Sequence, residues 1–317
     1  MNAPHPRSVR RVLALIATAA LVAAAVVVAR GRSEDLLPPP LPPRAPRGEL
    51  SVRVLRGPHH AALLVARVRI DGKGPYPFLV DTGAAISVVN APLAAELHLP
   101  VVQRRSGRLQ GAGCTSSSGE DRMVRWRVGN VGLPAIDVST VHLSPSTASS
   151  SVQGLLGSDL WDRFGSLSID YHRGVVRLGV VPAGKSVGVR VVTTGGEVVV
   201  LVPVDVGGKG PYPFVVDTGA SESVVSQDLA RTHHLRRIEG PVTVAAVGCT
   251  SKASMVEVTH WRSGTIPLPS GVALSLPHPL GGRSGDQVGI LGSNELSRFG
   301  TATIDYAGSR LVFSGGT

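Results

Sequence analysis

The sequence predicts an all-β protein made of two similar lobes, and three observations support this fold class. Strand-like runs dominate the chain, whereas long helical periodicity is absent beyond the N-terminus. The 38 glycines and 24 prolines among 317 residues are too many for a helical bundle and suit many tight turns. One thirteen-residue stretch also occurs twice, so the two halves of the chain share one design.

The repeat begins with GKGPYPFLVDTGA at Gly72 and GKGPYPFVVDTGA at Gly208, which are identical at 12 of 13 positions. Three later motifs recur in the same order, namely Gly-Cys-Thr-Ser at Gly113 and Gly248, a tryptophan at Trp126 and Trp261, and the related runs GLLGSDLWDRFGSLSIDY (154–171) and GILGSNELSRFGTATIDY (289–306). Two copies are too few for a solenoid or a propeller. We therefore predict two lobes related by a pseudo-twofold axis, packed like a homodimer joined into one chain.

The repeat and the composition divide the chain into six segments. They are a short basic tail (1–11), an apolar segment (12–29), a Pro-rich linker (30–58), lobe 1 (59–180), an interlobe connection (181–194) and lobe 2 (195–317). The prolines of the linker favour an extended, polyproline-type spacer. We expect both tryptophans of the repeat to pack in the cores of their lobes.

The apolar segment 12–29 contains 18 residues without a charge and follows three arginines. This length lies at the low end for a bilayer-spanning helix and exceeds the usual core of a signal peptide. Three interpretations stay open, namely a transmembrane signal anchor, a signal peptide cleaved after Ala29 and a buried helix of the folded domain. Short basic tails usually stay in the cytoplasm. We therefore expect a membrane-anchored protein with an extracytoplasmic body, or a secreted protein if the signal is cleaved.

The net charge of +10 is carried mainly by arginines that are spread along the chain. They form no run of five or six and lack the aromatic interleaving that a nucleic-acid platform needs, so we predict no nucleic-acid partner. His59-His60 and His233-His234 do not occupy corresponding places in the repeats, and adjacent strand residues point to opposite faces. We therefore predict neither a metal site nor another cofactor.

Each copy of the thirteen-residue stretch ends with Asp-Thr-Gly-Ala, which begins at Asp81 in one copy and at Asp217 in the other. Only residues near a twofold axis meet their own equivalents, so loops at the axis bring these two aspartates into one site. Carboxylates about 3 Å apart cannot both ionise, and the pair holds one proton in mild acid. One member can then deprotonate a water while the other donates a proton to a scissile carbonyl. The pair is our candidate catalytic centre.

The residues beside each aspartate fit a supporting role. Thr82 and Thr218 supply hydroxyls for hydrogen bonds across the axis, and Gly83 and Gly219 allow a tight turn that aims an N–H at the carboxylate. An apolar run before each aspartate predicts a buried strand. After each aspartate we expect a strand and a short helix, capped by Asn90 in one lobe or Ser226 in the other.

At these residues the chain resembles the aspartic proteases, specifically the bacterial retropepsin-like aspartyl proteases. The shared elements are Asp-Thr-Gly-Ala, a glycine-rich flap segment and a later apolar-apolar-Gly, and each occurs in both halves of residues 60–314. The resemblance implies a two-lobed acid-protease fold with the active site between the lobes. It also implies substrate-binding flaps, formed here by Gly111, Ala112 and Gly113 in one half and Ala246, Val247 and Gly248 in the other.

The implied function is an aspartic endopeptidase that acts on a polypeptide substrate. Both halves lie in one chain, so we expect a monomer containing an intramolecular pseudo-dimer. The alternative is a non-catalytic peptide-binding module with the same fold. Such modules often lose an aspartate, and this chain keeps both. The chain departs from the retropepsin pattern where Ser158-Asp159 and Ser293-Asn294 replace a common Gly-Arg-Asp/Asn.

The chain has only two cysteines, Cys114 and Cys249, and they occupy the same place in the two flaps. Flap tips of a retropepsin-like pair approach the pseudo-twofold axis, where repeat mates come within the roughly 5.5–6 Å Cα separation of a disulfide. An extracytoplasmic compartment permits such a bond. We predict a Cys114–Cys249 disulfide that ties the flaps together, with two free thiols as the alternative.

Overall fold

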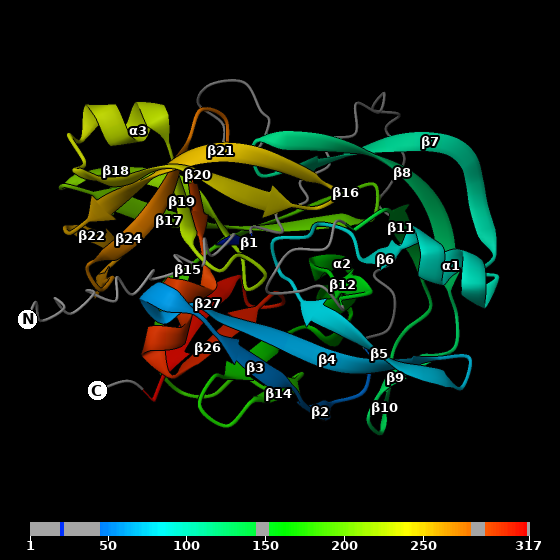
Figure 1. Ribbon diagram of the computed structural model, residues 1–317. Coiled ribbons are helices and arrows are strands. Elements are labelled where there is room, and N and C mark those ends of the chain that lie inside the picture. The colour runs from blue at the N-terminus through cyan, green and yellow to red at the C-terminus, as the bar shows by residue number, and fades with distance from the viewer. Residues whose placement is uncertain (1–19, 22–44, 144–151, 280–288, 316–317) are drawn as a thin grey trace, which may run out of the picture.

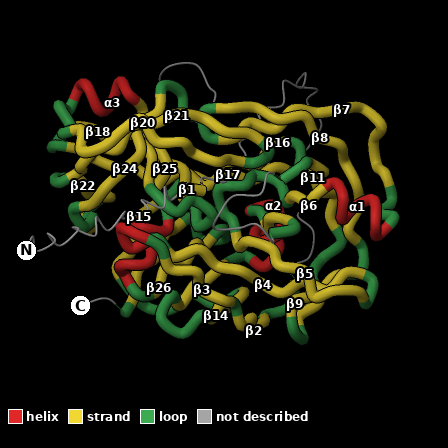
Figure 2. Tube along the Cα trace, viewed as in Figure 1, coloured by secondary structure: helices red, strands yellow, loops and turns green. Residues whose placement is uncertain are grey.

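The computed structural model describes residues 20–21, 45–143, 152–279 and 289–315. These residues form three β-sheets, and the α-helices among them are short, with none longer than α1 (Ala91–Leu97). Each lobe has its own large sheet, and a third sheet contains strands of both lobes (Figure 1, Figure 2). The predicted all-β, two-lobed fold is confirmed.

The sheet of lobe 1 has ten strands in the order β10-β9-β4-β5-β12-β6-β11-β8-β7, with β3 paired to β4. In chain order these strands are β3 (Arg53–Arg56), β4 (Ala62–Ile70), β5 (Lys73–Val80), β6 (Val88–Asn90), β7 (Val101–Gly111), β8 (Cys114–Met123), β9 (Trp126–Val128), β10 (Val131–Gly132), β11 (Ile136–Val141) and β12 (Gly154–Leu156). The short helices of this lobe are η1 (Pro58–His60), α1, α2 (Ser158–Trp161) and η2 (Asp162–Phe164).

The sheet of lobe 2 has eleven strands in the order β1-β20-β21-β24-β19-β25-β18-β17-β22-β23, with β16 paired to β17. These strands are β1 (Ala20–Leu21), β16 (Arg190–Thr194), β17 (Glu197–Val206), β18 (Lys209–Val216), β19 (Ser223–Ser226), β20 (Arg237–Ala246), β21 (Cys249–Val258), β22 (Trp261–Ser263), β23 (Ile266–Pro267), β24 (Gly271–Leu276) and β25 (Gly289–Leu291). Its helices are α3 (Gln227–Thr232), α4 (Ser293–Leu296) and η3 (Ser297–Phe299).

The third sheet joins the lobes at their base, in the order β15-β27-β26-β13-β14-β2. Its strands are β2 (Gly48–Ser51), β13 (Leu167–Asp170), β14 (Val175–Leu178), β15 (Lys185–Gly188), β26 (Thr301–Asp305) and β27 (Arg310–Ser314). In the central antiparallel pair, Ser168 lies opposite its own repeat mate Thr303, whose hydroxyl donates to Ser168 Oγ at 2.8 Å. The pseudo-twofold axis therefore passes between β13 and β26.

The segments expected as connections also contribute strands. β2 and β3 belong to the Pro-rich stretch 30–58, and β15 and β16 belong to the connection 181–194. One apolar core includes side chains of both lobes and of the shared sheet. Trp126 and Trp261 lie in this core, and their indole N–H groups donate to Pro134 O at 2.6 Å and Pro269 O at 2.8 Å. Their predicted core packing is confirmed.

The N-terminal apolar segment differs from the expected helix where the structure describes it. Ala20 and Leu21 form β1, which pairs in parallel with Val244 and Ala245 of β20. The edge of β20 offers unpaired backbone groups, and an extended segment satisfies them where a helix cannot. The other residues of 12–29 lie outside the described residues. Within residues 20–21, 45–143, 152–279 and 289–315, no helix is long and apolar enough to span a membrane.

Candidate active site

Buried strands deliver Asp81 and Asp217 to the middle of the molecule. β5 ends in Phe78-Leu79-Val80, and each of these side chains is at most 1% exposed. β5 is paired in parallel with β12, and the Asp81 N–H continues this ladder by donating to Leu156 O at 3.0 Å. β18 and β25 repeat the arrangement in lobe 2, with the Asp217 N–H donating to Leu291 O at 3.0 Å. Each aspartate therefore leaves a buried strand at an equivalent point.

Reciprocal hydrogen bonds of two threonines lock the aspartate loops together across the axis. The Thr82 hydroxyl donates to Val216 O at 2.8 Å and accepts from the Thr218 N–H at 3.1 Å. The Thr218 hydroxyl donates to Val80 O at 2.7 Å and accepts from the Thr82 N–H at 3.1 Å. All these groups are buried, so little water competes for their hydrogen bonds. The structure thus brings together the threonines that the sequence singled out.

Backbone amides hold one oxygen of each carboxyl and leave the other oxygen free. Asp81 Oδ1 accepts from the N–H groups of Gly83 and Ala84, both at 3.0 Å. Asp217 Oδ1 accepts from Gly219 at 2.8 Å and Ala220 at 2.9 Å. Neither Oδ2 atom receives a hydrogen bond from the described residues, although both are buried. The free oxygens are the groups available to a water or a substrate.

The burial of this pair raises the pKa of both carboxyls. Asp81 and Asp217 are each 0% exposed. Burial, and next the charge of Asp217, hold the pKa of Asp81 well above its usual value. Burial raises the pKa of Asp217 to about 7, although hydrogen bonds from backbone amides oppose the increase. The pair therefore retains a proton in mild acid and titrates as one unit.

Gly83 and Gly219 touch the carboxyl group of the opposite lobe. A Cβ on Gly83 would lie 2.2 Å from Asp217 Cγ, and a Cβ on Gly219 would lie 2.3 Å from Asp81 Cγ. No larger residue fits at these positions without moving the aspartates. The Thr-Gly sequence is therefore required for two reasons. The threonine locks the loops together, and the glycine allows the carboxyls to meet.

Serines support the loops at the point where the chain departs from the retropepsin pattern. Ser158 Oγ donates to Thr82 O at 2.8 Å and lies 2.9 Å from the hydroxyl of Tyr306. Its mate Ser293 accepts from the Ala62 N–H at 3.2 Å. Each serine thus connects its own lobe to a residue of the other lobe, which gives the junction a second set of contacts.

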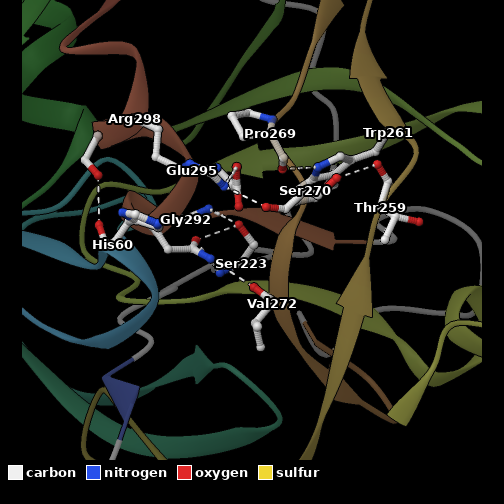
Figure 3. A network of polar contacts seen from close by, with 12 residues as sticks. His60, Ser223, Thr259, Trp261, Pro269, Ser270, Val272, Gly292, Glu295 and Arg298 are labelled. Carbon is white, nitrogen blue, oxygen red and sulfur yellow. Dashed lines mark hydrogen bonds and ion pairs between the residues drawn. The ribbon is translucent and has the colours of Figure 1, made fainter. Parts of the chain in front are cut away.

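Sequence reasoning missed a pair of buried glutamates beside the lobe 2 loop. Glu222 and Glu295 are 5% and 1% exposed, and burial raises the pKa of each to about 8. His59 Nδ1 lies 3.1 Å from Glu222 Oε1, and the Arg298 guanidinium lies 3.7 Å from Glu295 Oε2. Figure 3 shows Glu295 and Arg298 among the polar contacts of this region.

A comparison of the two repeats contained a signal for these glutamates. Their mates in lobe 1 are Ile86 and Leu160, so two positions change from apolar to acidic between otherwise similar runs. Asp159 is a third buried acid, with Asn294 as its mate. Burial raises the pKa of Asp159 to about 7. Its Oδ1 accepts from the Ser87 hydroxyl at 2.8 Å, as Asn294 Oδ1 accepts from Ser223 at 2.9 Å.

The predicted flap residues lie at the tips of two hairpins. Flap 1 is the β7–β8 hairpin and flap 2 is the β20–β21 hairpin, and Figure 1 shows them extending toward each other from the two lobes. Gly113 and Gly248 turn the tips with φ values of 73° and 68°, which favour glycine. Ala112, Ala246 and Val247 are buried, as is Gly111. A disulfide joins Cys114 to Cys249, with the Cα atoms 6.0 Å apart.

Two Asp-Thr-Gly loops facing each other between β lobes define an aspartic-protease type of site. The family model described as "Aspartyl protease" matches residues 66–160 and 202–294 in tandem. The chain therefore belongs to the aspartyl protease family. No curated protein matches the chain.

Solved structures of similar outline include an aspartic proteinase from Irpex lacteus, conglutin gamma (a basic 7S globulin from lupine seeds) and a protein titled edgp. Their sequence identities are 14%, 10% and 11%, with TM-scores of 0.49, 0.48 and 0.48. The matches cover 86%, 86% and 87% of this chain, and 98%, 96% and 96% of those chains.

Proposed function

We propose that this protein is an aspartic endopeptidase, which hydrolyses peptide bonds with a water held between Asp81 and Asp217. One observation carries the proposal, namely that both buried carboxyls keep one oxygen free while backbone amides hold the other. The raised pKa values support it, because the chemistry needs one protonated and one ionised member. Membership of the aspartyl protease family supports the hydrolase class.

In the proposed reaction the ionised carboxyl takes a proton from the water as its oxygen attacks the carbonyl carbon. The protonated carboxyl gives its proton to the carbonyl oxygen, which forms a neutral tetrahedral diol. A proton then passes to the peptide nitrogen, the C–N bond breaks, and a carboxylic acid and an amine are released. The proton belongs to the pair, so either aspartate can begin as the acid.

The experiment that tests this function is a digest of an unfolded, cysteine-free polypeptide with the full chain. New N- and C-termini identified by mass spectrometry support the proposal. The alternative function, a peptide-binding module, predicts retention of the polypeptide without new termini. We also propose that one monomer completes the site, and that the body lies outside the cytoplasm, anchored or secreted. Sedimentation tests the first of these statements, and fractionation of the source cells tests the second.

Cleavage is expected to be fastest in mild acid and to fall at higher pH, where the pair loses its shared proton, because burial and the charge of the partner raise the pKa at which that last proton leaves. The sign follows from the mechanism, since the active pair contains one proton and is inactive once both carboxyls are ionised. Ala84 and Ala220 supply only N–H groups to the carboxyls, without a hydroxyl that would stabilise the ionised pair. The kcat/KM for a fluorogenic peptide, measured across the pH range, checks this. An optimum near about pH 2 contradicts this prediction, because it would mean that the pKa of the aspartate pair is low.

Gly219→Ala is expected to lower kcat/KM at least about a hundredfold, because a Cβ 2.3 Å from Asp81 Cγ separates the two carboxyls. The effect should fall mainly on kcat, since the flaps are unchanged. Gly132→Ala is the matched control, because a Cβ there meets nothing within 4 Å. Equal activities of the two variants would show that the close approach of Gly219 is not needed for the chemistry.

A further inference from the structure

The tip of each flap packs against the opposite lobe. Ala112 of flap 1 lies in an apolar cluster of lobe 2 that includes Ala220, the residue after the second Asp-Thr-Gly. Ala245 and Val247 of flap 2 lie in the corresponding cluster of lobe 1, which includes Ala84. Each tip is therefore packed beside the aspartate loop of the opposite lobe.

Hydrogen bonds join the two flap tips to each other. The Ser116 hydroxyl of flap 1 donates to Val247 O at 3.0 Å, and the Ser251 hydroxyl of flap 2 donates to Ala112 O at 2.9 Å. The backbones are close, since a Cβ on Gly111 would lie 2.9 Å from Ala246 Cβ. Below the tips both aspartates are fully buried. A substrate must displace the tips before it reaches the pair.

The disulfide turns this cover into a closed ring. Residues 114–249 and the Cys114–Cys249 bond form one covalent loop, which includes Asp217. The flaps can rise together as an arch, but their tips cannot separate while the bond is intact. A chain bound over the aspartates therefore passes through the ring. Both cysteines are partly exposed residues at the flap tips.

We propose that the Cys114–Cys249 disulfide determines which substrates reach the aspartates. With the bond intact, the protein accepts polypeptides that have an unfolded free end, because only an end can thread beneath the joined flaps. With the bond reduced, the tips separate and the site also accepts unfolded segments held between folded domains. This inference rests on the proposed peptidase function and adds to it a substrate class and a redox control.

The opening step is an ordinary thiol–disulfide exchange with a dithiol reductant. One thiolate of the dithiol attacks a flap sulfur, which forms a mixed disulfide and releases the other flap cysteine as a thiolate. The second thiol of the reductant then displaces the remaining flap cysteine. The reductant ends as a disulfide, having lost two electrons and two protons, and the protein gains two thiols. Oxidation by a disulfide of the same class reverses the step.

The test compares two cysteine-free substrates that contain the same unfolded segment, a peptide that the full chain either cleaves or retains in the digest described above. In the open-ended substrate, one folded domain carries the segment as a free tail. In the blocked substrate, the segment joins two stably folded domains. The enzymes are the oxidised full chain, the chain treated with dithiothreitol, and the double variant Cys114→Ser/Cys249→Ser, which has no bond to reduce.

The oxidised protein is expected to cleave the blocked substrate at least about thirtyfold more slowly than the open-ended one. For the reduced protein and the double variant the two rates should lie within about threefold of each other. Dithiothreitol should not alter the double variant, which excludes an effect of the reductant on the substrates. An oxidised protein, verified free of thiols, that cleaves both substrates equally fast overturns the inference.

A binding measurement separates this inference from the proposed function. Fluorescence anisotropy follows the association of both labelled substrates with Asp217→Asn, oxidised and reduced, so that no cleavage is needed. Slow association of the blocked substrate that reduction accelerates supports the gate even if no peptide bond is ever cut, in which case only the proposed hydrolysis fails. Association of both substrates at one rate in both redox states shows that the gate is wrong, whatever the activity.

Discussion

Asp81→Asn and Asp217→Asn are each expected to reduce kcat by about 10⁴-fold or more, since general acid and general base catalysis are both lost. Asparagine keeps the shape of the side chain, and its oxygen can still accept the N–H groups that hold Oδ1 in each loop. It cannot take a proton from water or share one with its mate. The measurement is single-turnover cleavage of a fluorogenic peptide in mild acid.

Asp137→Asn is the control for this experiment, because Asp137 pairs with Arg122 at the surface. The control should keep the activity of the parent protein. Both active-site variants should still bind the peptide, since the flaps and the walls of the site are unchanged. If either single variant retained more than about a tenth of the turnover, the shared-proton mechanism would be wrong.

The free energy of unfolding is expected to fall as pH rises from about 5 to about 8. Burial raises the pKa of Glu222 and Glu295 to about 8, above the ordinary value of 4.5 that applies in the unfolded chain. The folded protein therefore binds more protons than the unfolded chain within this interval. The stabilisation is complete below the unfolded pKa and is lost as pH rises through the folded pKa. Above it, two charged groups lie buried near each other.

The expected size of this loss is on the order of 5 kcal/mol for each glutamate, because one pKa unit corresponds to about 1.4 kcal/mol. In a chain of this size the loss lowers the melting temperature by about 10 °C or more. Calorimetry at several pH values measures it. The double variant Glu222→Gln/Glu295→Gln should make the curve less steep and exceed the parent in stability at the alkaline end. The raised pKa values of Asp81, Asp217, Asp159 and Glu197 contribute a slope of the same sign, which the double variant retains.

Glu257→Gln serves as the matched control for the stability experiment. Glu257 pairs with Arg236 on the surface of lobe 2. The free energy of unfolding of Glu257→Gln should therefore change with pH in parallel with that of the parent. If the Gln variants and the parent lost stability equally with pH, the buried glutamates would not be the source of the pH dependence.

The strands and the aspartate loops were predictable because their signals are local. Apolar runs that end in Asp-Thr-Gly predict a buried strand followed by a turn, and the structure contains both in β5 and β18. The helix cap at Ser226 was predictable for the same reason, and its hydroxyl accepts from the Leu229 N–H at 3.0 Å. Asn90 likewise occupies the N-cap position of α1, but its side chain makes no capping hydrogen bond. It instead accepts from the Leu143 N–H at 3.1 Å, a partner distant in sequence.

The sequence by itself determined the strand content, the two repeats and the residues that meet at a twofold axis, because repetition and periodicity are recorded residue by residue. Only the tertiary structure decided that β13 and β26 join the lobes in one sheet, and that the flap tips pack in opposite lobes. It also decided the burial of Glu222 and Glu295, which look like surface residues in the sequence. Burial and cross-lobe contact depend on what other segments place nearby, and no local pattern of residues contains that information.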